Sequence, residues 1–131
     1  MTRINCIPVQ ELSDRHLVAE YYELPRVFRL ARDYWRRITS AIADPEPDLP
    51  AKYTMGKGHV RFFYDKLEYL VRRQQSLITE MICRGYKPAF RDASKLAVGM
   101  PGQLYNDWTP SDEDMAINRQ RIAERLRASG E

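Results

Sequence analysis

Thr2 could supply this chain with a nucleophile, because removal of Met1 would leave its α-amine free. The pKa of a free α-amine is about 7.7–8.0, so a useful fraction of it is uncharged at neutral pH. A lysine side chain needs burial or a neighbouring cation to reach the same state. Because threonine is small, we expect methionine aminopeptidase to remove the residue before it. The start of the chain therefore predicts a candidate for covalent catalysis.

Glu23 is a candidate for electrostatic stabilisation and proton transfer beside such an amine. His16, Glu20, Glu23 and Arg26 are spaced by three or four residues, and this spacing would bring them to one face of a helix. A carboxylate and a cation arranged in this way are usually an ordinary surface pair that contributes a few tenths of a kcal/mol. Spacing alone therefore leaves a catalytic and a structural interpretation of Glu23 open.

The two histidines, His16 and His59, predict no metal site, because no third ligand stands at a suitable spacing. Each could instead cap a helix or lie at the edge of the core. Gly56-Lys57-Gly58 precedes His59 and could bring backbone amides close to an anion, but it lacks the spacing of a nucleotide-binding loop. A simple turn is the other interpretation of this segment.

Arginine accounts for 16 of the 21 basic residues, although the net charge is only +3. Its planar guanidinium recognises phosphates and bases through several hydrogen bonds at once. One stretch contains a single acid, Asp33, among five arginines: Arg26, Arg29, Arg32, Arg36 and Arg37. This row favours contact with a nucleic-acid backbone, and the alternative is a solvated helix flank. Four aromatic residues could stack on bases or belong to the core: Trp35, Phe90, Tyr105 and Trp108.

Three helices must position these residues. The recurrence of apolar residues predicts them at residues 14–42, 59–84 and from about 111 onward. Connections rich in proline and glycine, at residues 43–57 and 86–110, break the periodicity between them. No segment has the pattern of a strand. We therefore predict an all-α fold in which residues 1–131 form one compact domain of three main helices with long irregular connections.

Local signals predict where these helices begin, bend and end. Ser13 or Asp14 would cap the first helix, because a short side-chain oxygen satisfies the free amides of a first turn. Pro25 lacks a hydrogen-bond donor and predicts a kink or a break in the same helix. Gly85 would end the second helix in a left-handed conformation. Ser111 would cap the third helix.

Composition restricts the cellular setting that the sequence predicts. Cys6 and Cys83 match no metal or redox spacing, which is typical of reduced cysteines in a cytoplasmic protein. No apolar run approaches the ~20 residues that span a membrane. The start of the chain lacks the apolar region of a signal peptide. We therefore expect a cytoplasmic protein with no membrane partner.

Three blocks of the sequence carry a specific pattern. The first is TRIN at residues 2–5 together with ELSDRHLVAEYYELPRVF at residues 11–28. The second is GHVRFFYDKLE at residues 58–68, which continues to Arg73-Gln74 and Arg84-Gly85. The third and weakest is Ala116-Ile117 with Arg121 and Arg125. In these blocks the chain resembles the pyrimidine-dimer DNA glycosylase family, known as endonuclease V of the phage type.

The resemblance implies a repair enzyme that needs no metal and no cofactor. Such an enzyme cuts the glycosidic bond at a cyclobutane pyrimidine dimer in double-stranded DNA and then nicks the strand at the abasic site. The Thr2 amine would be the nucleophile that forms an imine, and Glu23 would be the essential carboxylate. DNA contacts would fall on Arg3, His16, Arg26, Arg121 and Arg125. We expect a monomer that acts at the nucleoid.

Tyr22 is a departure from the family pattern, since the best-known member has an arginine directly before the catalytic glutamate. The change removes a phosphate contact from the predicted DNA interface beside the lesion, but it does not alter Thr2 or Glu23. The sequence therefore leaves three possible lesions as the substrate: a pyrimidine dimer, an abasic site alone or another damaged base. Two other hypotheses are a non-catalytic DNA-binding module with the same fold and a helical protein that binds an acidic partner.

Overall fold

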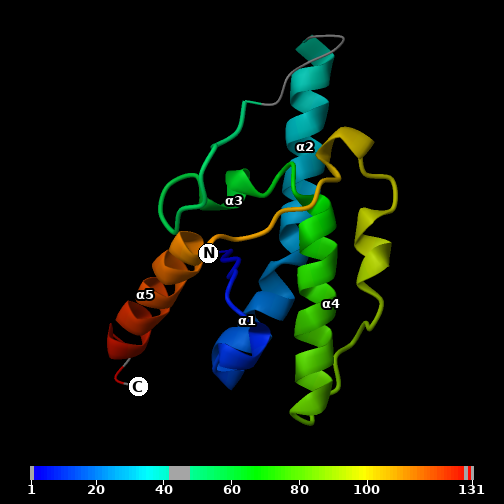
Figure 1. The fold of residues 1–131 in the computed structure, drawn as a ribbon. Coiled ribbons are helices and arrows are strands. Elements are labelled where there is room, and N and C mark those ends of the chain that lie inside the picture. The colour runs from blue at the N-terminus through cyan, green and yellow to red at the C-terminus, as the bar shows by residue number, and fades with distance from the viewer. Residues whose placement is uncertain (1, 42–47, 129, 131) are drawn as a thin grey trace.

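The structure is a computed structural model that describes residues 2–41, 48–128 and 130. These residues form helices and no strand, which confirms the predicted all-α fold (Figure 1). The α-helices are α1 (Asp14–Glu23), α2 (Pro25–Ala41), α3 (His59–Phe62), α4 (Leu67–Cys83) and α5 (Asp112–Ala128). Three short 3-10 turns are η1 (Val9–Glu11), η2 (Ala93–Ala97) and η3 (Gly102–Leu104). Met1 and the first part of the predicted loop at 43–57 lie outside the described residues, as does residue 42 of the first predicted helix.

The first predicted helix bends between α1 and α2, as Pro25 predicted (Figure 1). Leu24, at the junction, keeps helical dihedral angles of φ −56° and ψ −43°. Pro25 has no N–H to donate to the carbonyl of Tyr21, four residues earlier. The side-chain amide of Gln74 on α4 donates to that carbonyl instead, at 3.0 Å. A side chain of the neighbouring helix therefore satisfies the backbone group that the proline leaves without a donor.

Gln74→Ala should lower the free energy of unfolding by about 2–4 kcal/mol. The substitution leaves the Tyr21 carbonyl without its donor and empties the space of a fully buried side chain. Urea denaturation of the two proteins would measure the difference. Gln120→Ala on the exposed side of α5 is the control, with an expected change within about 0.5 kcal/mol. Equal effects of the two substitutions would contradict the role given to Gln74.

The continuous second helix predicted at 59–84 is wrong, because residues 63–66 separate α3 from α4. In an unbroken helix the Asp65 carbonyl would accept a hydrogen bond from the Tyr69 N–H. Asn106 binds both groups instead: its side-chain amide donates to the Asp65 carbonyl at 2.9 Å, and its carbonyl accepts from the Tyr69 N–H at 3.3 Å. A loop residue far along the chain therefore replaces a hydrogen bond of the helix.

The predicted helix ends are confirmed by their hydrogen bonds. Ser13 Oγ accepts from the His16 N–H at 3.2 Å at the start of α1. Gly85 follows α4 with a φ of +93°, a conformation that favours glycine. Ser111 Oγ accepts from the Asp114 N–H at 3.0 Å, while the Asp114 carboxylate accepts from the Ser111 N–H at 2.9 Å. This reciprocal arrangement is a capping box at the start of α5.

The buried apolar side chains of the described residues form one cluster, in which α4 packs against α1, η1 and η2. The apolar residues that recur along the first predicted helix are mostly buried, including Ala31, whereas Leu30 is exposed. Helix α5 differs from the others, because its one fully buried residue is Asn118. Figure 1 shows the N-terminal segment between α1 and α5. The packing of α5 therefore depends on a polar side chain close to that segment.

The aromatic residues that could have stacked on bases mostly serve the core. Trp108 stacks on Tyr53 with ring centres 5.6 Å apart, and Phe90 stacks on Tyr21 at 5.3 Å. Trp35 is partly buried against the core, and Tyr105 is exposed. Three of the four aromatic residues, Trp35, Phe90 and Trp108, therefore belong to the core or its edge.

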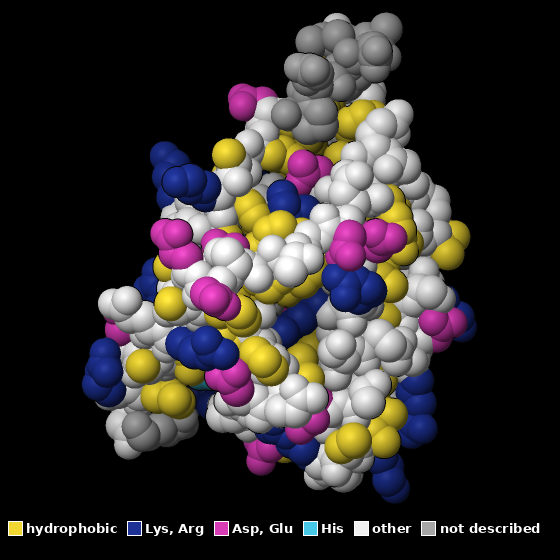
Figure 2. Space-filling model, in the orientation of Figure 1, with side chains coloured by type: hydrophobic (Ala, Val, Ile, Leu, Met, Phe, Trp, Pro, Cys, Tyr) yellow, Lys and Arg dark blue, Asp and Glu magenta, His cyan; other side chains and the backbone are white. Residues whose placement is uncertain are grey.

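The molecular surface has mixed charge on the face drawn in Figure 2, where acidic and basic side chains are interspersed. A search of the described helices finds none that combines the length and the apolar character needed to cross a membrane.

Candidate active site

The segment at residues 2–7 has no regular secondary structure, and its backbone is held by side chains. The Arg3 N–H donates to Glu23 Oε1 at 2.9 Å, and the Ile4 N–H donates to His59 Nε2 at 2.8 Å. One residue spans at most about 3.6 Å of chain, so the backbone nitrogen of Thr2 lies close to the Glu23 carboxylate. Glu23 is the last residue of α1, directly before the bend.

The next part of this segment is held by a buried amide of α5. Asn118 Oδ1 accepts from the Cys6 N–H at 2.7 Å and from the Ile7 N–H at 3.2 Å. Asn118 Nδ2 donates to Asn5 Oδ1 at 2.8 Å, and Asn5 Nδ2 donates to Glu20 Oε1 at 2.7 Å. Both side-chain amides thus have a donor and an acceptor engaged. This chain of hydrogen bonds joins α5 to α1 through the N-terminal segment.

A buried ion pair between α1 and α4 completes the network. Arg73 Nε donates to Glu20 Oε2 at 2.8 Å, and Arg73 Nη2 donates to Glu20 Oε1 at 3.1 Å. Arg73 Nη1 also donates to the Ile7 carbonyl. Burial alone would lower the pKa of Arg73, but the Glu20 carboxylate outweighs it and raises that pKa above the ordinary value. The guanidinium is therefore charged throughout the physiological range.

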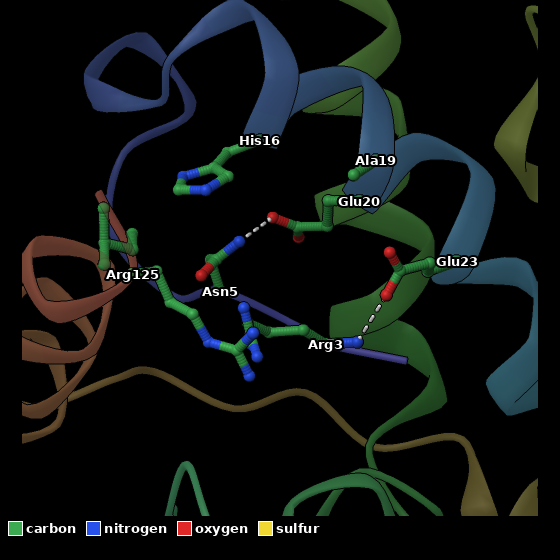
Figure 3. A pocket seen from close by; sticks show the side chains of 8 residues that line it. Arg3, Asn5, His16, Ala19, Glu20, Glu23 and Arg125 are labelled. Atoms are coloured by element: carbon green, nitrogen blue, oxygen red, sulfur yellow. Dashed lines mark hydrogen bonds between the residues drawn. The ribbon is translucent and has the colours of Figure 1, made fainter. Parts of the chain in front are cut away.

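A pocket of about 280 Å³ opens beside this network (Figure 3). Its lining combines two carboxylates, two guanidiniums, an imidazole and an amide with two apolar side chains: Arg3, Asn5, His16, Ala19, Glu20, Glu23, Ile122 and Arg125. Figure 3 shows the guanidiniums of Arg3 and Arg125 close together on one side, with Glu23 on the other. The pocket thus presents positive and negative charge to the same space.

Positive charge gathers at this pocket, where Arg3 and Arg125 line the space and the charge of Arg121 reaches Arg3. Partial burial, together with the charges of Arg125 and Arg121, lowers the pKa of Arg3 from its ordinary value. The nearby Glu23 carboxylate opposes this effect but does not overcome it. Like charges gathered in this way repel one another, and an anion between them would relieve the repulsion. The pocket is therefore suited to a ligand that carries negative charge.

His59 is a structural residue, as the core-edge interpretation held. Its Nδ1 lies 2.6 Å from the Thr54 carbonyl, and its Nε2 accepts from the Ile4 N–H. These partners require the neutral tautomer with the proton on Nδ1. Burial, followed by the charges of Arg3 and Arg121, lowers the pKa of the imidazole despite the opposing contact with Thr54.

The free energy of unfolding should therefore fall as the pH drops below about 6.5, the ordinary pKa of histidine. In that range the unfolded chain binds a proton at His59 that the folded chain resists, so acid favours unfolding. Urea denaturation at several values between pH 7.5 and 5.5 would measure the slope, and His59→Gln should flatten it. His16→Gln is the control and should keep the fall. An unchanged slope in His59→Gln would contradict the assignment.

The structure brings only some of the predicted site residues to the pocket. Arg3, His16, Glu23 and Arg125 line it. Arg121 lies outside the lining, where its guanidinium donates to the Met55 carbonyl at 3.1 Å.

Tyr22 and Arg26 are not among the residues that line the pocket. Tyr22 is 63% exposed and Arg26 is also exposed, near the bend that carries Glu23. The predicted arginine row lies on α2, where Arg29, Arg36 and Arg37 are also exposed. None of these three arginines, and not Arg26 either, forms an ion pair with another described residue. Arg32 contacts the sulfur of Met100 at 3.5 Å.

The sequence analysis did not predict the structural role of three polar residues that hold the site together, although their positions carried a signal. Arg73 stands three residues after Leu70 and four before Leu77, in register with an apolar face. Asn118 stands in the same way between Met115 and Ile122. Glu20 follows Leu17 by three. A polar residue at an apolar position must be buried with a partner, but the sequence does not identify that partner.

The glycines before His59 form a turn, as the simpler interpretation held. The His59 N–H donates to the Gly56 carbonyl at 3.1 Å, and Gly58 has a φ of +87°. Within the described part of the chain, no three His, Cys, Asp or Glu side chains gather as a metal ion would require.

A sequence model of the family described as pyrimidine dimer DNA glycosylase matches residues 1–93. The matched region contains Thr2, Glu23 and the ion pair of Glu20 with Arg73. Helix α5, with Asn118, Arg121 and Arg125, lies beyond it.

Proposed function

Because the chain belongs to the pyrimidine dimer DNA glycosylase family, we propose that it repairs double-stranded DNA through an imine to the Thr2 amine. The amine attacks the anomeric carbon of the damaged nucleotide, a carbon–nitrogen bond forms, and the bond to the base breaks. The sugar ring then opens: the bond from this carbon to the ring oxygen breaks, the oxygen takes up a proton, and an iminium forms. The iminium withdraws electrons, so the neighbouring sugar carbon loses a proton. The bond to the 3′ phosphate then breaks by β-elimination, and water releases the enzyme from the product.

The observation that carries this proposal is the hydrogen bond from the Arg3 N–H to Glu23. It keeps a carboxylate next to the residue whose amine would react. A negative charge there stabilises the cationic sugar and the iminium, and the carboxylate can accept a proton during elimination. The orientation of the pair is maintained by the rest of the segment, because Ile4 is tied to His59.

The arginines support a role in holding the DNA backbone. The charges of Arg121 and Arg125 both reach Arg3, and phosphates would neutralise this repulsion. We further propose that Arg26 contacts a phosphate beside the bend. The amine must reach a sugar inside a duplex, so the DNA would be kinked and a nucleotide extruded. Binding should accordingly weaken steeply as salt is raised.

Tyr22 should contribute to binding through its ring rather than through charge. It is exposed, directly precedes Glu23, and contacts Tyr21 edge-on with ring centres 5.0 Å apart. Stacking on a base contributes about 1–3 kcal/mol, so Tyr22→Ala should weaken binding to a duplex with a tetrahydrofuran site by about 5- to 150-fold. Tyr22→Arg should instead make the salt dependence steeper. Fluorescence anisotropy at several salt concentrations would measure both, and unchanged affinity of Tyr22→Ala would contradict the stacking role.

Borohydride trapping tests the proposed chemistry. The protein, with an N-terminus at Thr2 verified by mass spectrometry, is incubated with duplexes that carry a thymine dimer, an abasic site or no damage. Reduction converts an imine into a stable adduct, which peptide mapping assigns to a residue. An adduct at Thr2 with the dimer duplex supports the full proposal. An adduct with the abasic duplex alone supports a lyase and overturns dimer specificity. No adduct with either overturns the enzyme and supports a DNA-binding module.

A further inference from the structure

Asn118 is the one fully buried residue of α5 and is 0% exposed. The apolar residues around it are less enclosed: Met115 and Ile122 are only partly buried, and Ile117 is 37% exposed. Another contact of α5 with the start of the chain is the pairing of Arg119 with Glu11, which lies on the surface. The best-enclosed contact between α5 and the N-terminal segment is therefore made by an amide.

The contacts of Asn118 determine the orientation of the N-terminal segment. One oxygen accepts from two consecutive backbone N–H groups, those of Cys6 and Ile7. An acceptor shared in this way fixes the peptide plane between the two residues as well as its distance from the helix. The amide nitrogen of Asn118 also holds the side chain of Asn5. Thr2 is only three residues before Asn5, so an error in the orientation of this anchor would be transmitted to the reactive end.

The same face of α5 carries two arginines, one of which lines the pocket. Arg121 and Arg125 follow Asn118 by three and seven residues, which brings all three to one side of the helix. Arg125 lines the pocket, and the charge of Arg121 is felt at Arg3. One helix thus carries the anchor of the N-terminal segment, one cation that lines the pocket and a second cation whose charge reaches Arg3.

We infer that Asn118 is a positioning residue that fixes the reach of the Thr2 amine relative to Arg121 and Arg125. The inference rests on the proposed function, since it concerns how the amine meets a nucleotide whose phosphates the arginines hold. Asn118 is not among the residues that line the pocket. It acts through the backbone of Cys6 and Ile7. Because misplacement of a reacting group by about 1 Å lowers a rate by about 100-fold, loss of this anchor should reduce catalysis while the basic groups remain.

Asn118→Leu is the principal test, because leucine is similar in size and removes every hydrogen bond of the amide. The readout is the single-turnover rate of strand cleavage on a duplex with a preformed abasic site, with all enzyme folded as judged by circular dichroism. We expect the rate to fall by about 10- to 100-fold. Affinity for a duplex with a tetrahydrofuran site should change by less than about 3-fold, because Arg121 and Arg125 are retained. A wild-type rate would overturn the inference, as would a loss explained entirely by weaker binding.

Two further measurements separate positioning from general damage. Gln120→Leu makes a similar change of side chain two residues away, where Gln120 is exposed and its amide donates to Glu124 at 3.4 Å. Its cleavage rate should match the wild type. The reaction of the terminal amine with a small soluble aldehyde should proceed equally in Asn118→Leu and in the wild type, because the amine itself is unchanged. A slower reaction with the aldehyde would overturn positioning in favour of altered reactivity.

Asn118→Asp tests the same inference if the leucine variant does not fold. The carboxylate can still accept from the Cys6 and Ile7 N–H groups but cannot donate to Asn5. Its cleavage rate should lie nearer to the wild type than to Asn118→Leu, or, without a folded leucine variant, within about 10-fold of the wild type. A larger loss would overturn the role of the shared acceptor. If the wild type itself gives no borohydride adduct, the proposed function fails; if it gives one and the Asn118 variants cleave as fast, only this inference fails.

Discussion

Replacing Glu23 with glutamine should lower the single-turnover rate of strand cleavage at an abasic site by about 100- to 10,000-fold. A positioned acid or base contributes an effect of this size, and glutamine can neither carry the charge nor accept the proton. Its amide oxygen can still accept from the Arg3 N–H, as Glu23 Oε1 does at 2.9 Å. The amine should therefore stay in place while the electrostatic and proton-transfer roles are lost. Gel analysis of quenched reactions would measure the rate.

The control for this change is Glu80→Gln, which removes a carboxylate that pairs with Arg84 away from the pocket. Its cleavage rate should equal that of the wild type. The affinity of Glu23→Gln for a tetrahydrofuran duplex should fall by no more than a few-fold, since the arginines are intact. Undiminished cleavage by Glu23→Gln would contradict the role proposed for Glu23. Undiminished cleavage after acetylation of the terminal amine would contradict the role proposed for Thr2.

Breaking the ion pair of Glu20 with Arg73 should have the largest effect on stability. Both side chains are nearly inaccessible, at 2% and 7% exposure. Arg73→Met leaves the Glu20 carboxylate buried without its main partner and removes the donor to the Ile7 carbonyl. Loss of one member of a buried pair costs about 3–5 kcal/mol. Urea denaturation at pH 7 should therefore show a large loss of free energy of unfolding.

Arg72→Met is a matched control, because Arg72 is the preceding residue of α4 and pairs with Asp107 at the exposed surface. Its effect should be within about 1 kcal/mol. The double variant Glu20→Leu with Arg73→Met should lose less than the sum of the two single changes, since no uncompensated charge is left inside. Similar losses from Arg72→Met and Arg73→Met would contradict the importance given to burial.

The parts of the fold that depend on local signals could be predicted from the sequence. The caps at Ser13 and Ser111, the terminator at Gly85 and the bend at Pro25 each depend on residues within a few positions. The interruption at residues 63–66 depends on Asn106, about 40 residues away in the sequence. No local pattern contains that contact, so periodicity predicted a continuous helix.

The candidate site likewise has a part that the sequence predicted and a part that it could not predict. The spacing of His16, Glu20 and Glu23 predicted one helix face, and all three line the pocket. Spacing could not separate their roles: Glu20 is buried in an ion pair, whereas Glu23 is open to the pocket. The contribution of Asn118 could not be predicted, because its partners Cys6 and Ile7 are more than 110 residues away.

The attachment of residues 3–7 to side chains has a consequence for the order in which the protein matures on the ribosome. The N-terminus is synthesised first, yet its anchors lie in α1, α3 and α5. The last of these, Asn118, is synthesised 112 residues after Cys6, which it holds. A nascent chain can therefore form the contact with Glu23 early, but the complete arrangement waits for α5. Residues 3–7 therefore reach their final arrangement only after α5 has been made.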